Sequence, residues 1–166
     1  IIDTTQDILS KVWKLDVLIN NAWIWQKMKD IDEVTKEIVD DVIATNLTGL
    51  IHMTRLLLPA IRKADEWVII NVSSQSGFTA QAGQSVYTAT KYWVRGFTEV
   101  LKVDLKDTNV RIAWVYQAWT NTSMFATSWE AKDTSNFTEP SDLADVIIFM
   151  LSRPAKIWLH DVRVKF

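Results

Sequence analysis

Tyr87 and Lys91 are the residues whose types and spacing point most directly to proton chemistry. They stand four positions apart as Tyr-x-x-x-Lys. Apolar residues recur around them at three- and four-residue steps, which predicts an amphipathic helix over residues 83–105. Side chains at i and i+4 lie above one another on a helix, so the ammonium can lie near the phenol and favour phenolate. The pair therefore predicts a tyrosine of lowered pKa that acts as a general acid or base.

The pair has a second interpretation, a packed tyrosine beside a lysine whose stem covers apolar surface. The surrounding elements help to decide between the two. Short apolar runs rich in β-branched residues predict strands at 15–20, 67–73, 110–116 and 157–166. Helical periodicity predicts the end of a helix at 7–12, a long helical region at 30–63, and a helix from 138 to 151 that begins near Pro140 and stops before Pro154.

The alternation of strands and helices predicts the fold class. It favours an α/β, three-layer, Rossmann-like parallel sheet with helices on both faces, in one domain over residues 1–166. Ligands of such sheets lie outside the carboxyl ends of the strands. Polar residues follow the predicted strands at Asn20, Ser74 and Gln117, so we expect these side chains to meet at one rim.

Five ordered segments resemble the short-chain dehydrogenase/reductase family. They are the Asn-Asn-Ala at 20–22, Asn46 within the long helical region, Ser74 thirteen residues before Tyr87, the Tyr-x-x-x-Lys itself, and residues 115–124, which are similar to the family's Pro-Gly-x-x-x-Thr segment. The resemblance covers nearly the whole chain. It implies an oxidoreductase that uses NAD or NADP and acts on a small-molecule carbonyl or alcohol.

The resemblance also implies roles for single residues. Tyr87 would exchange the substrate proton, Lys91 would lower its pKa and hold the cofactor ribose, Ser74 would polarise the substrate oxygen, and Asn46 would keep a water for proton relay. Further cofactor-binding positions would be Asn20, Ala22, Gln117, Thr120 and Thr122. Ser73 fits the serine spacing less well. The alternatives are that Asn46 only kinks its helix and that Ser74 only shapes a turn.

Composition excludes several other functions. With no Cys there can be no disulfide, thiolate metal site or cysteine nucleophile, and His52 and His160 are too isolated to suggest a metal site. A net charge of −2 without a basic block argues against a nucleic-acid partner, and the apolar runs are too short for a membrane span. We expect a cytoplasmic protein that forms a homo-oligomer through its long helices.

The sequence departs from the family in two ways. No Gly-rich phosphate loop is present, so we expect a truncated fold in which the first βαβ half is missing and the strand at 15–20 forms an open edge. Trp also stands where the family has Gly, at Trp23 and at Trp13, Trp67 and Trp119, and Gln117-Ala118 replaces Pro-Gly.

Trp23 is the most consequential of these departures. Its indole must either occupy the cofactor's place or push the strand end away, so we predict that Trp23→Gly raises cofactor affinity and melting temperature together. The alternative function is therefore a non-catalytic fragment or redesigned half-fold that keeps the packing without binding cofactor.

Overall fold

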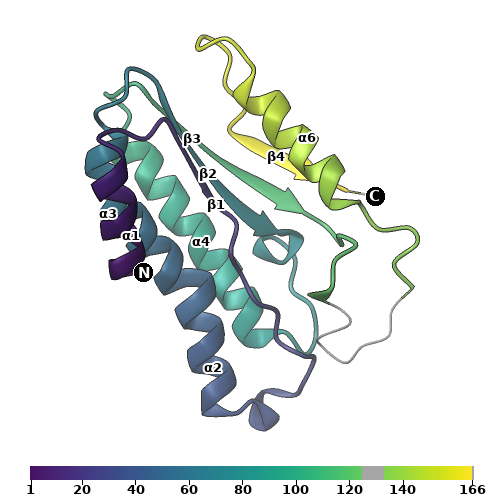
Figure 1. Ribbon diagram of the computed structural model, residues 1–166. Helices are drawn as coiled ribbons and strands as arrows, with labels where there is room; N and C mark the ends of the chain where they lie inside the picture. The colour runs from purple at the N-terminus through teal and green to yellow at the C-terminus, as the bar shows by residue number, and fades with distance from the viewer. Residues whose placement is uncertain (125–132, 166) are drawn as a thin grey trace.

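The computed structural model describes residues 1–124 and 133–165, and its sheet is parallel throughout (Figure 1). The strands are β1 (Val17–Asn20), β2 (Trp67–Ser74), β3 (Val110–Gln117) and β4 (Asp161–Val164), in that spatial order. Val17 pairs with Val68 across β1 and β2, and Trp67 pairs with Val110 across β2 and β3. The predicted parallel sheet is confirmed, and β1 forms one of its edges within the described chain.

Helices cover both faces of this sheet, which confirms the three-layer prediction. Figure 1 shows α1, α3 and α4 on one face and α6 on the other. The bounds are α1 (Ile2–Lys11), η1 (Ile31–Glu33), α2 (Lys36–Ile43), η2 (Ala44–Gly49), α3 (Leu50–Ile61), η3 (Gln75–Gly77), α4 (Ser85–Asp104) and α6 (Pro140–Leu151). The predicted long helical region at 30–63 thus contains a 3-10 turn, two α-helices and a π-helical segment between them.

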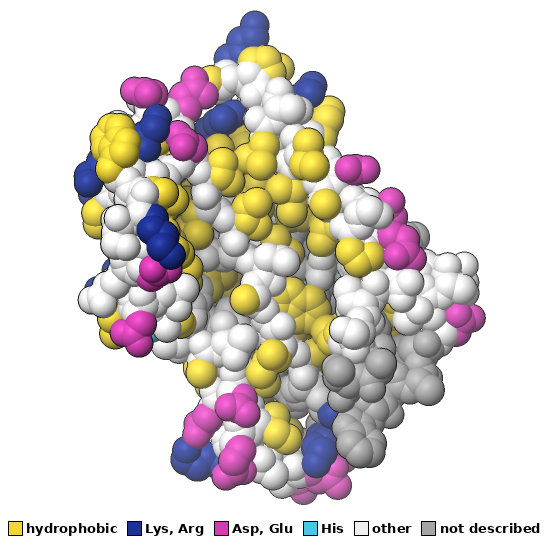
Figure 2. Space-filling view, viewed as in Figure 1, with side chains coloured by type: hydrophobic (Ala, Val, Ile, Leu, Met, Phe, Trp, Pro, Cys, Tyr) yellow, Lys and Arg dark blue, Asp and Glu magenta, His cyan; other side chains and the backbone are white. Residues whose placement is uncertain are grey.

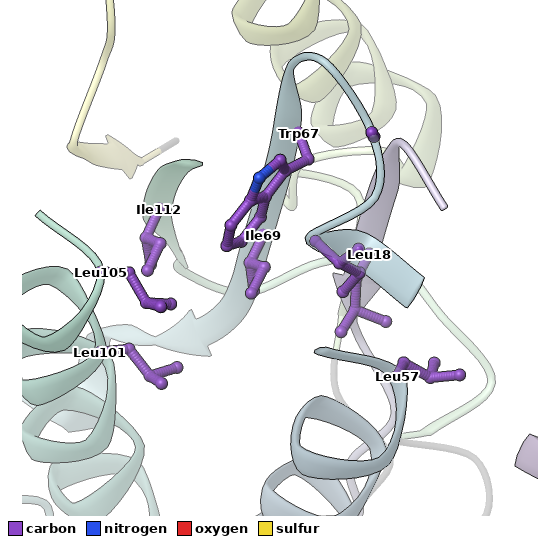
Figure 3. Close-up of a cluster of buried hydrophobic side chains, with 9 residues drawn as sticks. Leu18, Leu57, Trp67, Ile69, Leu101, Leu105 and Ile112 are labelled. Atoms are coloured by element: carbon purple, nitrogen blue, oxygen red, sulfur yellow. The ribbon is translucent and has the colours of Figure 1, made fainter. Parts of the chain in front are cut away.

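Side chains of β2 alternate between two cores, as the period of a strand requires. Trp67 and Ile69 join the core under α3 and α4, whose members include Leu57, Leu101 and Leu105 (Figure 3). Val68, Ile70 and Val72 join the core under α6, with Leu143 and Met150. Trp67 is therefore a core residue, and its indole lies away from the carboxyl ends of the strands.

A buried polar chain ties the sheet to the helices of the first face. Asn20 Nδ2 donates to Asn71 Oδ1 at 2.8 Å and to Thr54 Oγ1 at 3.0 Å. Asn71 Nδ2 donates in turn to Thr98 Oγ1 at 2.8 Å. Satisfied polar groups of this kind fix the relative positions of the elements that carry them. Here they fix β1 and β2 against α3 and α4.

The second face is covered only over part of its width. Pro140 opens α6, and reciprocal hydrogen bonds between Glu139 and Asp142 cap it. Val17 and Ile19 of β1 point to the same face and are each 41% exposed. Figure 2 shows hydrophobic side chains gathered in a hollow on the face seen in this view. No helix in the described ranges is long and apolar enough to cross a membrane.

Candidate active site

Two adjoining spaces lie at the carboxyl ends of the strands. A small cavity of about 60 Å³ is lined by Ser74 and Tyr87 together with Gln117 and Thr120. A crevice of about 760 Å³ runs from the end of β1 to α6 and is lined by Asn21, Ile147 and Leu151 among others. The rim on which the sequence placed its polar residues is therefore a real concave surface, as expected for a parallel sheet.

Ser74 and Tyr87 form the polar centre of the small cavity. The Ser74 hydroxyl lies close enough to the Tyr87 phenol to influence its pKa, and Ser74 Oγ accepts from the Ser76 N–H at 3.2 Å, which caps η3. The adjacent Ser73 is fully buried, and its Oγ has no partner among the residues described. The spacing argument therefore chose the serine that lines the cavity.

The pKa of Tyr87 moves in the direction opposite to the sequence prediction. Burial raises it above its usual value, although the neighbouring Ser74 hydroxyl opposes this shift. Tyr87 is only 3% exposed, and loss of hydration disfavours the phenolate. The prediction of a lowered pKa is wrong because it counted the neighbouring cation and could not count burial.

Lys91 is itself too deeply buried to act as a permanent cation. It is 1% exposed, and burial lowers its pKa to about 7. Its Nζ lies 5.4 Å from the centre of the Tyr87 ring, so the predicted proximity of the pair is confirmed. At neutral pH the amine is present in both protonation states, which weakens its pull on the phenol.

The Trp23 indole also lies against this amine. The Lys91 Nζ lies 4.7 Å from the centre of the indole, and the Trp23 and Tyr87 ring centres are 5.9 Å apart. Trp23 lines both the cavity and the crevice. Because β1 keeps its register with β2 up to Asn20, the indole occupies the site and does not push the strand end away.

Asn46 holds the segment that carries Trp23. It lies in the π-helical segment η2, where the side chain is buried and turned towards the chain beyond β1. Its Oδ1 accepts from the Ile24 N–H at 2.7 Å, and its Nδ2 donates to the Ile24 carbonyl at 2.9 Å and to Thr90 Oγ1 at 3.3 Å. π-Helical segments often mark functional sites. In this chain the π-helical segment carries Asn46, the side chain that holds residues 23–25 beside the cavity.

Gln26 positions Tyr87 and was missed from the sequence. Its Oε1 accepts from the Tyr87 backbone N–H at 3.0 Å, and its Nε2 donates to the Gly83 carbonyl at 3.2 Å. The N-cap residue of α4, Gln84, makes no capping bond with its own side chain. A buried side chain from a segment about sixty positions earlier thus satisfies the helix N-terminus.

Gly83 makes this junction possible through its backbone. Its φ is +74°, a conformation that L side chains rarely adopt, and a Cβ there would lie 3.1 Å from the Lys29 nitrogen. The Lys29 N–H donates to the Gly83 carbonyl. The turn before α4 is therefore fixed against residues 26–29.

The five positions predicted only for cofactor binding separate in the structure. Gln117, Thr120 and Thr122 line both the cavity and the crevice, and the buried Thr120 Oγ1 has no partner among the described residues. Asn20 instead turns inward to Asn71 and Thr54, and Ala22 is exposed and outside both linings.

Other lining residues carried no sequence signal. They include Trp25, Gln75, Gln81 and Gln84 in the cavity, whereas Asn21 of the crevice belongs to the Asn-Asn-Ala segment at 20–22. Trp119 also lines the cavity, whereas Trp13 is 69% exposed on the surface. Within residues 1–124 and 133–165, no group of three or more acidic or histidine side chains is placed to hold a metal ion.

Known proteins are similar to this chain in both sequence and fold. The family model for short chain dehydrogenase matches residues 1–133. D-beta-hydroxybutyrate dehydrogenase of Cupriavidus necator is 31% identical over 88% of this chain and 66% of its own length. The NADP-dependent 3-hydroxy acid dehydrogenase of Escherichia coli K12 is 30% identical over 90% of this chain and 64% of its own.

Solved structures agree. Serine dehydrogenase in complex with NADP+ superposes with a TM-score of 0.85 at 25% identity, over 98% of this chain and 71% of its own. The 3-ketoacyl-(acyl-carrier-protein) reductase of Brucella melitensis in complex with NADH gives a TM-score of 0.84 at 28% identity, over 98% and 70%. The chain spans about two thirds of the length of the relatives it matches. It belongs to the short-chain dehydrogenase family.

Proposed function

We propose that this chain is the catalytic part of an NAD- or NADP-dependent oxidoreductase that interconverts a carbonyl compound and an alcohol. The observation that carries the proposal is the pair of hydroxyl groups, Ser74 and Tyr87, that line one cavity at the carboxyl ends of the strands. A hydroxyl pair in that setting can bind a carbonyl oxygen and transfer a proton to it.

The protonation states of the site suit the reduction of a carbonyl. Because burial raises the pKa of Tyr87, its hydroxyl keeps its proton at neutral pH and can donate it to the developing alkoxide. Ser74 would donate a hydrogen bond to the same oxygen. Lys91, with a pKa of about 7, can return a proton to Tyr87. Asn46 acts on this chemistry by holding the Trp23 to Trp25 segment through Ile24.

The crevice fits the nicotinamide end of a dinucleotide. It is large, lies at the carboxyl ends of parallel strands, and is bordered by Gln117, Thr122 and the Thr120 hydroxyl, which has no partner in the described part of the chain. These residues would hold the cofactor, which when bound would supply or accept the hydride. The fit is poorer at Lys91, because the Trp23 indole covers the amine that would contact a ribose.

That same contact favours a second candidate, a non-catalytic domain that keeps the packing of the family. Gln117 and Ala118 in place of Pro-Gly point in the same direction. The two candidates differ in cofactor binding. We expect this chain to bind NADH and NADPH only weakly, with dissociation constants of about a millimolar.

Titration of the chain against NADH and NADPH, followed by nicotinamide fluorescence, tests this proposal. Saturable weak binding that Tyr87→Phe leaves in place, and that Lys91→Ala reduces once Trp23→Gly has uncovered the amine, would support the oxidoreductase. No saturation by either nucleotide would favour the non-catalytic domain. Submicromolar binding would mean that the nucleotide site is elsewhere.

We further propose that the protein acts in the cytoplasm as a homo-oligomer. Tyr92, Trp93, Val100 and Val103 are exposed apolar side chains on α4, and such a surface favours burial against another copy. Sedimentation at tens of micromolar tests this, and a clean monomer would contradict it.

A further inference from the structure

The lining of the small cavity carries no charge among the residues that the structure describes. It combines the indoles of Trp23, Trp25 and Trp119 with the amides of Gln75, Gln81 and Gln84, beside the Ser74 and Tyr87 hydroxyls. The Lys91 amine lies outside this lining and against the Trp23 indole, and burial lowers its pKa to about 7.

Such a lining disfavours an anionic substrate. A carboxylate that leaves water for a site without a cation loses hydration and gains no ion pair in return. This matters because the relatives of this chain include proteins named for hydroxybutyrate and for 3-hydroxy acids, whose substrates carry a carboxylate. The cavity of this chain offers that group nothing of opposite charge in its described part.

Two polar atoms of the lining lack a hydrogen-bond partner among the residues that the structure describes, and they indicate what a ligand would supply. The Oε1 of Gln84 is an acceptor on a side chain only 2% exposed, and the buried Oγ1 of Thr120 belongs to the same lining. Buried polar groups without a partner cost free energy, so a ligand that pairs with them binds more tightly. The Gln84 oxygen requires an O–H or N–H donor.

The size of the cavity limits which part of a ligand it holds. About 60 Å³ has room for a carbonyl and a few neighbouring atoms. A flat ring would therefore lie where Trp23 and Trp25 border both the cavity and the crevice. Stacking against indole faces favours aromatic or conjugated rings over aliphatic ones.

We infer that the substrate of this site is an uncharged ketone or alcohol with an aromatic or conjugated ring and a second hydrogen-bond donor near the reacting carbon. The claim that this compound is a substrate rests on the proposed function, whereas the claim that it binds in the cavity does not. It assigns the stacking surface to Trp25 and the recognition of the donor to Gln84.

A matched pair of probes separates charge from shape. 2-Hydroxyacetophenone and benzoylformate share a phenyl ketone, to which the first adds a hydroxymethyl group and the second a carboxylate. Hydroxyacetone keeps the hydroxymethyl ketone of the first but lacks the ring. Binding of each to the chain is measured by ligand-observed NMR, which needs neither cofactor nor turnover. We expect 2-hydroxyacetophenone to bind at least about tenfold more tightly than either of the other two.

Variants of the chain test the assigned residues. Trp25→Ala should weaken the binding of 2-hydroxyacetophenone about tenfold, whereas Trp93→Ala, on the exposed face of α4, should leave it unchanged. Thr122→Arg places a cation at an exposed point of the lining and should bring the affinity for benzoylformate at least level with that for 2-hydroxyacetophenone.

The outcomes distinguish this inference from the proposed function. Equal or tighter binding of benzoylformate by the unaltered chain, or no binding of 2-hydroxyacetophenone at millimolar concentration, overturns the inference. Selective binding of 2-hydroxyacetophenone without any hydride transfer from NADH or NADPH overturns the proposed function and leaves the inference standing. Preferential reduction of benzoylformate overturns the inference and supports the proposed function.

Discussion

Replacement of Trp23 by glycine should lower the stability of the protein and open its site. The indole is partly buried against the Lys91 amine and the Tyr87 ring, in a segment that Asn46 holds in place. Truncation of a fully buried Trp costs about 3–5 kcal/mol, so a partly buried one should cost about 2 kcal/mol. The contact with the Lys91 amine adds about 0.5 kcal/mol when the amine carries its proton.

This expectation reverses one half of the prediction from the sequence. Overpacking at a strand end would have made Trp23→Gly stabilising, but β1 keeps its pairing with β2 and the indole has a place to lie. We now expect the free energy of unfolding to fall by about 2–3 kcal/mol and the melting temperature by about 5–10 °C for a chain of this size. The expected rise in cofactor affinity is kept, because the Lys91 amine becomes accessible.

Denaturant unfolding at pH 7 and titration with NADPH measure the two effects on the same samples. Trp13→Gly is the matched control, because Trp13 also lies near a lysine, at 6.0 Å from the Lys14 amine, but is 69% exposed. It should change neither quantity. An unfolding free energy for Trp23→Gly that stays within about 0.5 kcal/mol of the unaltered chain would refute the packing argument.

Further expectations concern the residues around Tyr87. The buried Lys91 has a native pKa of about 7, below that of the unfolded chain, so between pH 7 and about 10 only the unfolded chain holds this proton. The free energy of unfolding should therefore rise with pH in that window, by up to about 1.4 kcal/mol per pH unit. Urea unfolding of Lys91→Met should lack this contribution. Parallel pH profiles for the variant and the unaltered chain would contradict the pKa shift. Gln26→Ala removes the acceptor of the Tyr87 N–H and should lower the free energy of unfolding by about 1–2 kcal/mol. Amide exchange at the start of α4 should become faster. Unchanged exchange there would show that the helix does not need this cap.

Sequence patterns sufficed for the arrangement of elements and for the core of the site. The strand and helix periodicities predicted the elements, because each period reports which side chains face the interior, and the alternation of strands and helices then predicted the parallel sheet. The spacing of Ser74, Tyr87 and Lys91 predicted that their side chains lie close together, and in the structure they do. Ser74 ends β2, and Tyr87 and Lys91 lie in the first two turns of α4. Their spacing is the part of the site that the family resemblance supplied.

Other features depend on burial and on contacts between distant segments, which no local pattern records. Gln26 reaches Tyr87 across sixty-one positions, and neither neighbour marks it as a capping residue. Asn20 sits at a strand end like Asn21, yet the pleat turns it inward to Asn71 while Asn21 lines the crevice. The direction of the Tyr87 pKa shift required the depth of its burial, which the sequence does not contain.

Transfer of an isotopic label tests the central claim most directly. The chain is incubated at millimolar cofactor with NADPH or NADH deuterated at the transferable position and with 2-hydroxyacetophenone, and the alcohol product is analysed by mass spectrometry. We predict that deuterium appears on the carbinol carbon, and that Tyr87→Phe reduces the rate by about 10²–10⁴ while cofactor binding persists. Equal label transfer by Tyr87→Phe and the unaltered chain would contradict the assignment of Tyr87 as the proton donor, and no transfer by either would contradict the proposed activity.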